Sequence, residues 1–312
     1  MICYYHNDAD GMISAAWVYL LSKSTFIDNF DNKFIEVSYK DNENFPIDVI
    51  NKDEDVFIVD FSVNPETMDK ILEITTHVNW IDHHETAIDM YADYPVTISG
   101  LREIGIAGCE LTRIYIEKKM NWCAKNGSSS GCTIPKTLSE VSKYIGDRDV
   151  WKFEYPETKD FYAGYETVAE LTPLTAGILL DAHGVDGLIK IGKIINAYKR
   201  ESRLKACRFA YESTYHVTCL GDTLNTININ SHRCLICNST DKTSELFGDR
   251  FKDYDFVAIY VFDGDSYNVS LYSDEKIAVN VIAKIYGGGG HRYAAGFECK
   301  VLPSWLVCGD HI

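Results

Sequence analysis

Acidic and histidine side chains gather in four short motifs of the chain. The motifs are His6-Asn7-Asp8-Ala9-Asp10-Gly11, the single residue Asp60, Asp82-His83-His84 and Gly146-Asp147-Arg148-Asp149. If these carboxylates met at one site, they would repel one another and shift one another's pKa values strongly. Divalent cations would remove that repulsion, and Asp together with His suits manganese, iron or zinc better than calcium. The residue types therefore indicate metal-assisted chemistry.

The elements that position these motifs are predicted to be short strands alternating with helices. Strands are expected over residues 2–5, 34–39, 55–61 and 77–81, and helices over residues 11–22, 65–76 and 109–119. Such alternation predicts an α/β fold with a mostly parallel N-terminal sheet and flanking helices. The first three motifs come at strand ends, and the carboxyl ends of parallel strands form the crevice in which ligands bind. Each motif alone is common in turns and helix caps, but the full set in this order predicts one metal site.

The second half of the chain has a different pattern. A surface loop is predicted at residues 125–135 from its Gly and Ser content, and a helical pattern covers residues 171–211. Strand patterns follow at residues 215–220, 226–229, 256–262 and 267–272, and then a helix at 277–286. We therefore expect a catalytic domain at residues 1–165, a helical connector at 166–213 and a smaller α/β C-terminal substrate-binding domain at 214–312.

The composition of the 312-residue chain is that of a globular protein. Its 46 Asp and Glu outnumber its 30 Lys and Arg, so the formal net charge is −16. Because phosphate contacts dominate the binding of long nucleic acid, this charge argues against a long duplex as the main partner. It leaves open a locally basic groove, or acids collected around metal ions. No apolar run approaches the ~20 residues of a membrane span and no basic signal segment begins the chain, so we expect a cytoplasmic protein without a membrane partner.

The ten cysteines raise the question of disulfides or zinc. In a reducing compartment most cysteines are small buried hydrophobes, and we expect the same here. Cys234 and Cys237 form a CxxC pair just after His232, but no second pair of ligands follows. A structural zinc site needs four ligands, so the pattern does not favour one.

Two of the motifs resemble those of the DHH phosphoesterase superfamily. Asp82-His83-His84 after the HxDxDG loop at residues 6–11 is similar to the N-terminal domain of that family, and GGGGHRYAAGF at residues 287–297 is similar to its DHH-associated C-terminal domain. Members with this pair of domains include RecJ-type exonucleases, nanoRNases and cyclic-nucleotide or cyclic-dinucleotide phosphodiesterases. The resemblance implies the same two domains here, and two divalent cations, usually manganese, as cofactors.

The resemblance also implies a set of site residues. Its metal ligands correspond to His6, Asp8, Asp10, Asp60, His83 and Asp149. Its catalytic residues correspond to Asp82, His83 and His84, and its substrate-binding residues to Gly288, Gly289, Gly290, His291 and Arg292. The first metal ion would lie between His6 and Asp8, with Asp60 bridging to a second ion held by Asp10, His83 and one acid of the fourth motif. Asp149 is the preferred acid because it precedes Phe153 by four residues, as in relatives, and Asp147 is the alternative.

Two departures from the family pattern bear on the substrate. His6 stands two residues before Asp8, as in the RecJ-like pattern, whereas many relatives have a histidine four residues before the DxD pair. Tyr272 stands where several relatives carry an arginine, so a phosphate contact is missing or is supplied by Arg292 or another base.

The expected function is that of a two-metal phosphodiesterase that hydrolyses short oligonucleotides or (cyclic) dinucleotides to mononucleotides. The alternatives are a RecJ-like exonuclease on single-stranded DNA, for which the basic stretch at residues 190–208 could serve, hydrolysis of pyrophosphate or polyphosphate, and a catalytically silent nucleotide sensor or sponge. The expected partner is a small nucleotide or short oligonucleotide. Formation of a homodimer is left open.

Overall fold

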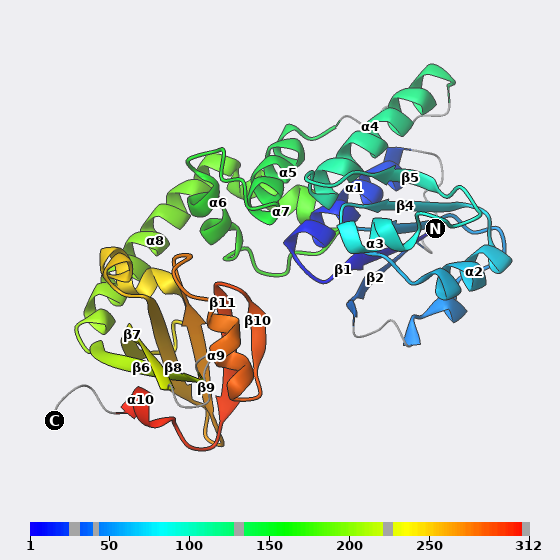
Figure 1. Cartoon of the computed structure of the whole chain (residues 1–312). Coiled ribbons are helices and arrows are strands. Elements are labelled where there is room, and N and C mark those ends of the chain that lie inside the picture. The colour runs from blue at the N-terminus through cyan, green and yellow to red at the C-terminus, as the bar shows by residue number, and fades with distance from the viewer. Residues whose placement is uncertain (25–31, 40–43, 128–133, 221–226, 308–312) are drawn as a thin grey trace. The chain divides into compact units, whose positions relative to one another are not determined.

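The first part of the chain folds around a five-stranded β-sheet. The computed structural model describes residues 1–24, 32–39, 44–127, 134–220 and 227–307, and the chain forms two compact units, Met1–Asn196 and Ala197–Ile312 (Figure 1). The strands of the first unit are β1 Ile2–His6, β2 Lys33–Val37, β3 Val56–Val59, β4 Val78–Asp82 and β5 Ser99–Arg102. They lie in the order β2-β1-β3-β4-β5, and every neighbouring pair is parallel. The predicted α/β class with a parallel N-terminal sheet is confirmed.

Both faces of this sheet are buried, as is usual for a parallel sheet. The helices of the first unit are α1 Ala9–Ser24, α2 Pro65–Ile74, α3 Glu85–Met90, α4 Gly108–Lys125, α5 Lys136–Asp149, α6 Thr158–Tyr165 and α7 Ala176–His183. Alternate side chains of β1 and β3, such as Tyr5 and Val59, belong to a core shared with α1, α4 and α5. The intervening side chains, such as Tyr4 and Ile58, pack with Met68 and Ile71 of α2. The period-two alternation of the strands therefore fixes which helices cover which face.

The predicted helical stretch at residues 171–211 is two helices. Gly184, with φ of 65°, ends α7, and α8 then runs over Val185–Cys207 and into the second unit. A left-handed φ at the residue after a helix favours glycine, which has no Cβ to clash. None of the described helices is both long enough and apolar enough to span a membrane.

The second unit is built on a mixed sheet in the order β10-β11-β9-β8-β7-β6. Its elements are β6 Tyr211–Leu220, β7 Ile227–Asn238, the 3-10 helix η3 Ser244–Asp253, β8 Phe256–Phe262, β9 Tyr267–Tyr272, α9 Val279–Ile285, β10 Gly289–His291, β11 Ala294–Cys299 and α10 Ser304–Val307. Only β7 and β8 pair in parallel among the described strands of this sheet. One face packs on α9 and α10, and the other on η3 and the end of α8.

Several elements differ from the prediction. Strand β5 was not predicted, because SGLR has no alternating apolar pattern and lies at an edge of the sheet. The strand expected at 226–229 continues to Asn238, because the polar run at residues 230–233 that ended the prediction is still paired with β6. The fourth acidic motif lies in the last turn of α5 rather than after it. Of the loop predicted at 125–135, residues 128–133 lie outside the described part of the chain.

The CxxC pair lies in strand β7, on opposite faces of the sheet. Cys234 belongs to the core on the α9 side, and its thiol donates to the carbonyl of Ser213 at 3.3 Å. Cys237 belongs to the opposite core, and its thiol donates to the carbonyl of Ala206 at 3.5 Å. Two thiols on opposite faces cannot bind one zinc ion. Of the seven cysteines whose side chains are described, five are buried.

Candidate metal centre

Three neighbouring strand ends bring the first three motifs together. His6 is the last residue of β1, Asp60 directly follows β3, and Asp82 is the last residue of β4. Because β1, β3 and β4 are adjacent and parallel, their carboxyl ends lie side by side at one edge. Asp60 adopts the left-handed conformation, with φ of 54°, and its amide donates to the carbonyl of Ile81 at 2.9 Å. The turn that takes the chain away from β3 is therefore anchored on β4.

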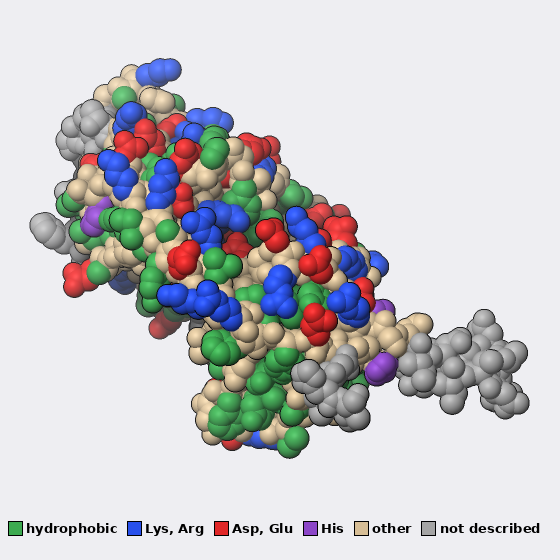
Figure 2. All heavy atoms as spheres, turned by 90° about the vertical axis from the view of Figure 1, so that its left-hand side faces the viewer, with side chains coloured by type: hydrophobic (Ala, Val, Ile, Leu, Met, Phe, Trp, Pro, Cys, Tyr) green, Lys and Arg blue, Asp and Glu red, His purple; other side chains and the backbone are tan. Residues whose placement is uncertain are grey.

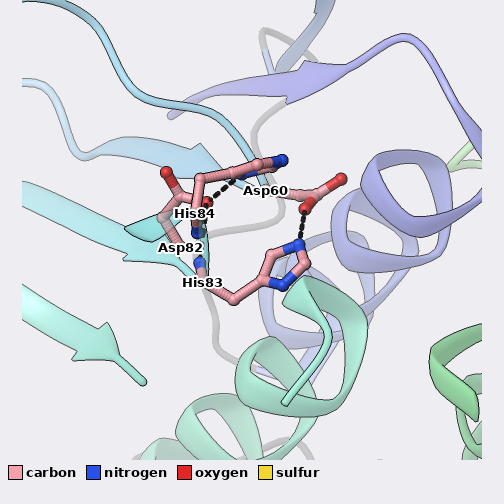
Figure 3. Close-up of side chains that lie close together, drawn as sticks. All are labelled: Asp60, Asp82, His83 and His84. Atoms are coloured by element: carbon pink, nitrogen blue, oxygen red, sulfur yellow. Dashed lines mark hydrogen bonds and ion pairs between the residues drawn. The ribbon is translucent and has the colours of Figure 1, made fainter. Parts of the chain in front are cut away.

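The carboxylate of Asp60 lies at the middle of the cluster. Its Oδ1 is 3.2 Å from His83 Nε2, and its Oδ2 is 3.9 Å from His6 Nδ1; Figure 3 shows the His83 ring facing this carboxylate. Asp60 is buried, and neither of its oxygens has a hydrogen-bond partner among the described residues. A buried carboxylate without a donor is costly, and divalent cations are the partners that suit two such oxygens. The buried carboxylate of Asp60, which has no hydrogen-bond partner among the described residues, therefore fits a metal ion.

Among the described residues, three overlapping groups of side chains could each hold a cation, and two of these groups contain the six candidate ligands. His6, Asp8 and Asp60 offer ligand atoms within 4.8 Å of one another, and Asp10, His83 and Asp149 do the same. His83 Nε2 lies 3.7 Å from Asp10 Oδ2 and 3.4 Å from Asp149 Oδ2. The structure thus brings together all six residues that the sequence suggests as metal ligands.

The electrostatics of the cluster favour added positive charge. Burial, followed by the charges of Asp10 and Asp8, raises the pKa of Asp60 well above its usual value. Burial and the charge of Asp10 raise the pKa of Asp149 to about 7. Both shifts mean that, without cations, these carboxylates tend to hold protons near neutral pH. A divalent cation would replace those protons.

The two histidines of the third motif have opposite properties. Burial lowers the pKa of His83, which leaves its imidazole neutral near pH 7, as a metal ligand must be. A hydrogen bond to Asp82 raises the pKa of His84, which favours its charged form. The bond joins His84 Nδ1 to Asp82 Oδ1 at 2.8 Å (Figure 3). His83 is therefore suited to bind a metal ion, and His84 to donate a hydrogen bond.

Asp82 is fully buried, and its oxygens are occupied by the protein. Oδ1 accepts from the amide of His83 at 2.7 Å as well as from the His84 ring. Oδ2 accepts from the hydroxyl of Ser62, which in turn accepts from Trp80 Nε1 at 2.9 Å. Asp82 thus orients the two histidines. Ser62 and Trp80, whose hydrogen bonds hold Asp82 in place, were not predicted from the sequence.

The start of helix α4 holds Asp10 in place. The amides of Gly108 and Cys109 donate to Asp10 Oδ2 and Oδ1 at 2.7 and 2.8 Å. The first amides of a helix have no partner within it, and the helix dipole also favours a carboxylate there. Gly108 was missed by sequence reasoning; the only signal was a glycine directly before the helix expected at residues 109–119.

The structure separates the two acids of the fourth motif. The carboxylate of Asp147 accepts from the amides of Glu154 at 2.8 Å and Tyr155 at 3.3 Å, and from the hydroxyl of Thr158. It is buried and closes the turn after α5. Asp149, by contrast, faces His83. The geometry therefore favours Asp149 over Asp147 as a ligand.

The suggested substrate-binding residues lie in the second unit. Gly288 and Gly290 allow close backbone packing, because a Cβ on either would stand 2.1 Å from the carbonyl of Gly296 or 2.7 Å from Ala295 Cα. Gly289 and His291 pair with β11 in a hairpin, and His291 and Arg292 at its tip are exposed. Tyr272 donates its hydroxyl proton to the carbonyl of Lys242. Close backbone packing explains why glycine is needed at positions 288 and 290. The role of this segment in substrate binding stays a prediction.

The basic stretch at residues 190–208 lies on α8 and just beyond its end. Its exposed cations include Lys193, Lys199 and Arg200. Arg203 is paired with Asp241 at 2.7 Å and with Glu245 at 2.5 Å. On the face shown in Figure 2, Lys and Arg side chains lie among Asp and Glu side chains. This mixture is typical of a solvated surface.

Comparisons with known proteins give three findings. The family model described as DHH family, N-terminal domain, matches residues 1–142. The uncharacterized protein R106 of Acanthamoeba polyphaga mimivirus is 25% identical over 320 residues, which cover 98% of this chain and 69% of that protein. The pGpG-specific phosphodiesterase PggH from Vibrio cholerae is 11% identical with a TM-score of 0.50, over 96% of this chain and 93% of that one. At this identity the likeness to PggH shows a shared fold.

Proposed function

This chain belongs to the DHH superfamily of phosphoesterases, with the family's N-terminal domain at residues 1–142, and from this premise we propose that it is a metal-dependent phosphodiesterase. The proposed substrates are short oligonucleotides or (cyclic) dinucleotides, the proposed products are mononucleotides, and the proposed metal is manganese. The RecJ-like, polyphosphate-hydrolysing and silent-sensor alternatives become outcomes of the test below.

One observation carries the proposal: the buried carboxylate of Asp60 has no hydrogen-bond partner among the described residues, belongs to one group of His and Asp ligands and lies 3.2 Å from His83 of a second group. His6 and Asp8 would hold one cation with Asp60, and Asp10, His83 and Asp149 would hold the other. Two cations so held would stabilise negative charge on a phosphate and make an attacking water more acidic. Two ligand groups, adjacent where Asp60 Oδ1 of one lies 3.2 Å from His83 Nε2 of the other, support a two-metal rather than a one-metal site.

The protein's own residues prepare this site. Asp60 is kept in place by its turn and by the close contact of α4, so its carboxylate needs no reorganisation when cations bind. The Nε2 of neutral His83 already faces Asp60 Oδ1 at 3.2 Å. Asp10 receives two helix amides, which hold its carboxylate in one orientation. Such pre-organisation is the main contribution that a protein makes to electrostatic catalysis.

His84 is the proposed contact to the phosphate that reacts. In the charged form, which its raised pKa favours, Nδ1 donates a proton to Asp82 and Nε2 carries a second proton that is available to a substrate oxygen. Its side chain is 34% exposed, whereas that of Asp82 is fully buried. His84 can therefore touch substrate and would be a catalytic residue, and Asp82, Ser62 and Trp80 would be positioning residues.

Two further considerations support small nucleotide substrates. The shared fold with PggH includes both units of the chain, and that protein's name describes a pGpG-specific phosphodiesterase. The net charge of −16 disfavours a long anionic polymer, because that polymer would meet repulsion beyond the cations. A short substrate is attracted locally by the metal site and meets less of this repulsion.

The test is a panel of substrates incubated with manganese and analysed by chromatography. The panel holds linear di- and trinucleotides, cyclic mono- and dinucleotides, single-stranded DNA, pyrophosphate and polyphosphate. We expect the highest kcat/KM on a linear or cyclic dinucleotide or a trinucleotide, with activity lost in chelator and in Asp60→Asn. Preference for single-stranded DNA or polyphosphate would replace the proposal by that alternative. Tight nucleotide binding without turnover would identify a sensor.

A further inference from the structure

The turn that follows α5 has an unusual residue at its critical position. Helix α5 ends at Asp149, Val150 caps it, and the next residue, Trp151, has φ of 58°. The amide of Trp151 donates to the carbonyl of Arg148 at 3.0 Å, and that of Lys152 donates to the carbonyl of Asp147 at 3.0 Å. These two bonds define a Schellman motif, in which the residue with positive φ is usually glycine. A tryptophan is strained in this conformation.

Packing in the fold does not explain this tryptophan. The side chain of Trp151 is 73% exposed, so it contributes little to any hydrophobic core. Its described ring contact is an edge-to-face one with Phe153, whose centroid is 4.8 Å away. Glycine at this position would remove the strain and would lose only the contact with Phe153 and the minor part of the tryptophan surface that is covered. Strain that the fold does not need is a reason to look for a function.

The turn nevertheless holds Trp151 in a defined place. The buried carboxylate of Asp147 accepts hydrogen bonds from the amides of Glu154 and Tyr155, on the far side of the turn. Phe153 also has positive φ, of 52°, and its amide donates to the carbonyl of Asp147 at 3.4 Å. The segment is therefore cross-linked by hydrogen bonds, and the indole is presented to solvent from a fixed backbone.

Trp151 is also close to the candidate metal centre. It follows Asp149 by two residues, so their Cα atoms are at most about 7–8 Å apart. Asp149 Oδ2 itself lies 3.4 Å from His83 Nε2. Because the Cα of Trp151 is this near to a candidate ligand, we expect the sugar and base of a nucleotide whose phosphate is bound at the centre to reach this turn.

We propose that Trp151 is a stacking platform for a nucleobase of the substrate. The inference rests on the proposed phosphodiesterase function and adds to it that the base, and not only the phosphate, is recognised in the first unit. An exposed indole stacks on any base, and such stacking contributes enough binding energy to change affinity about 5- to 150-fold. The platform therefore favours nucleotides over pyrophosphate or polyphosphate without selecting one base.

The test compares Trp151→Gly and Trp151→Phe with the wild-type chain. The substrates are a linear dinucleotide and its abasic analogue, and both KM and equilibrium binding are measured. For Trp151→Gly we expect a melting temperature a few degrees higher and a KM for the dinucleotide about 5- to 150-fold higher, with a much smaller change for the abasic analogue. Trp151→Phe should keep part of the affinity, because it keeps an aromatic face.

Trp122 provides a matched control. It is 65% exposed and lies 14 residues beyond Gly108 along α4, which corresponds to about 21 Å of helix. Trp122→Phe should leave both KM values unchanged.

The outcomes separate the two proposals. An equal loss on both substrates, an unchanged KM, or a lower melting temperature in Trp151→Gly would overturn the stacking inference. If wild-type protein hydrolyses neither these two substrates nor any other nucleotide of the panel above, the proposed function is wrong. The equilibrium binding measurement then still tests the stacking inference. If the wild-type protein does not bind the dinucleotide, the stacking inference is wrong as well.

Discussion

Gly108 lies so close to Asp60 that a Cβ added to it would stand 2.6 Å from Asp60 Oδ1 and 2.7 Å from Asp60 Cβ. Real Cβ atoms essentially never approach other atoms this closely, so no other residue fits without moving the carboxylate. The same glycine gives its amide to Asp10 Oδ2 at 2.7 Å. One residue at the start of α4 thus sets the position of two candidate metal ligands.

Gly108→Ala should therefore weaken metal binding while the fold is retained. The added methyl group has to displace Asp60 or shift α4 away from Asp10, and we expect manganese affinity to fall at least about ten-fold, which corresponds to about 1.4 kcal/mol. Titration calorimetry with manganese measures this. Gly177→Ala is the matched control, since a Cβ at this α7 position meets nothing within 4 Å. Unchanged affinity in Gly108→Ala would show that the contact does not matter for the metal.

Asp60→Asn should abolish metal-dependent hydrolysis and stabilise the metal-free protein near pH 8. The amide keeps the shape of the side chain and tolerates its left-handed backbone, but removes a buried charge that Asp10 and Asp8 oppose. Turnover assays and thermal melts in chelator provide the two readouts. Asp53→Asn is the control, because Asp53 is exposed and has a similar φ of 59°. More than a tenth of wild-type turnover in Asp60→Asn would contradict the two-metal model.

The metal-free protein should lose stability as the pH rises from 6.5 to 8. The raised pKa values of Asp60 and Asp149, the latter about 7, mean that the folded state binds protons that the unfolded state has released. Stability from such groups is complete below their unfolded pKa and is lost as the pH passes their folded pKa. The raised pKa values of His6 and His84 also make the folded protein lose stability as the pH rises. The lowered pKa of His83 affects stability mainly below pH 6.5.

Thermal melts in chelator across that pH range measure the effect. Manganese should raise the melting temperature more at pH 8 than at pH 6.5, because binding competes with protons. Asp149→Asn should flatten the pH dependence. A melting temperature that stays constant or rises with pH in the metal-free wild-type protein would contradict the direction of these shifts.

Substitution of Asp147 and of Asp149 should affect different properties: the first should lower stability, and the second should weaken metal binding. Asp147→Ala removes the acceptor of two amides and a hydroxyl inside the protein, so we expect a loss of about 2–3 kcal/mol in the free energy of unfolding. Asp149→Asn should leave stability in chelator unchanged or higher, and should weaken manganese binding. Denaturant unfolding and calorimetry on both variants measure this. The reverse pattern would make Asp147 the ligand.

Local sequence patterns predict that the first three motifs meet at one edge of the sheet. His6, Asp60 and Asp82 end strands that the alternation of apolar segments already predicts to be parallel, and parallel neighbours must bring their carboxyl ends to one edge. The order of the motifs and the fold class followed from local patterns, because the periodicity of a strand or helix is a property of adjacent residues.

The groups that hold those residues in place come from distant parts of the chain. Gly108 supports Asp10 across 98 residues of sequence, and Ser62 supports Asp82 across 20, in each case through one hydrogen bond that no local pattern encodes. The choice between Asp147 and Asp149 also depended on the direction in which each side chain leaves α5. Hydrogen-bond partners and side-chain directions follow from the packing of distant elements, and for that reason they were not predictable from the sequence.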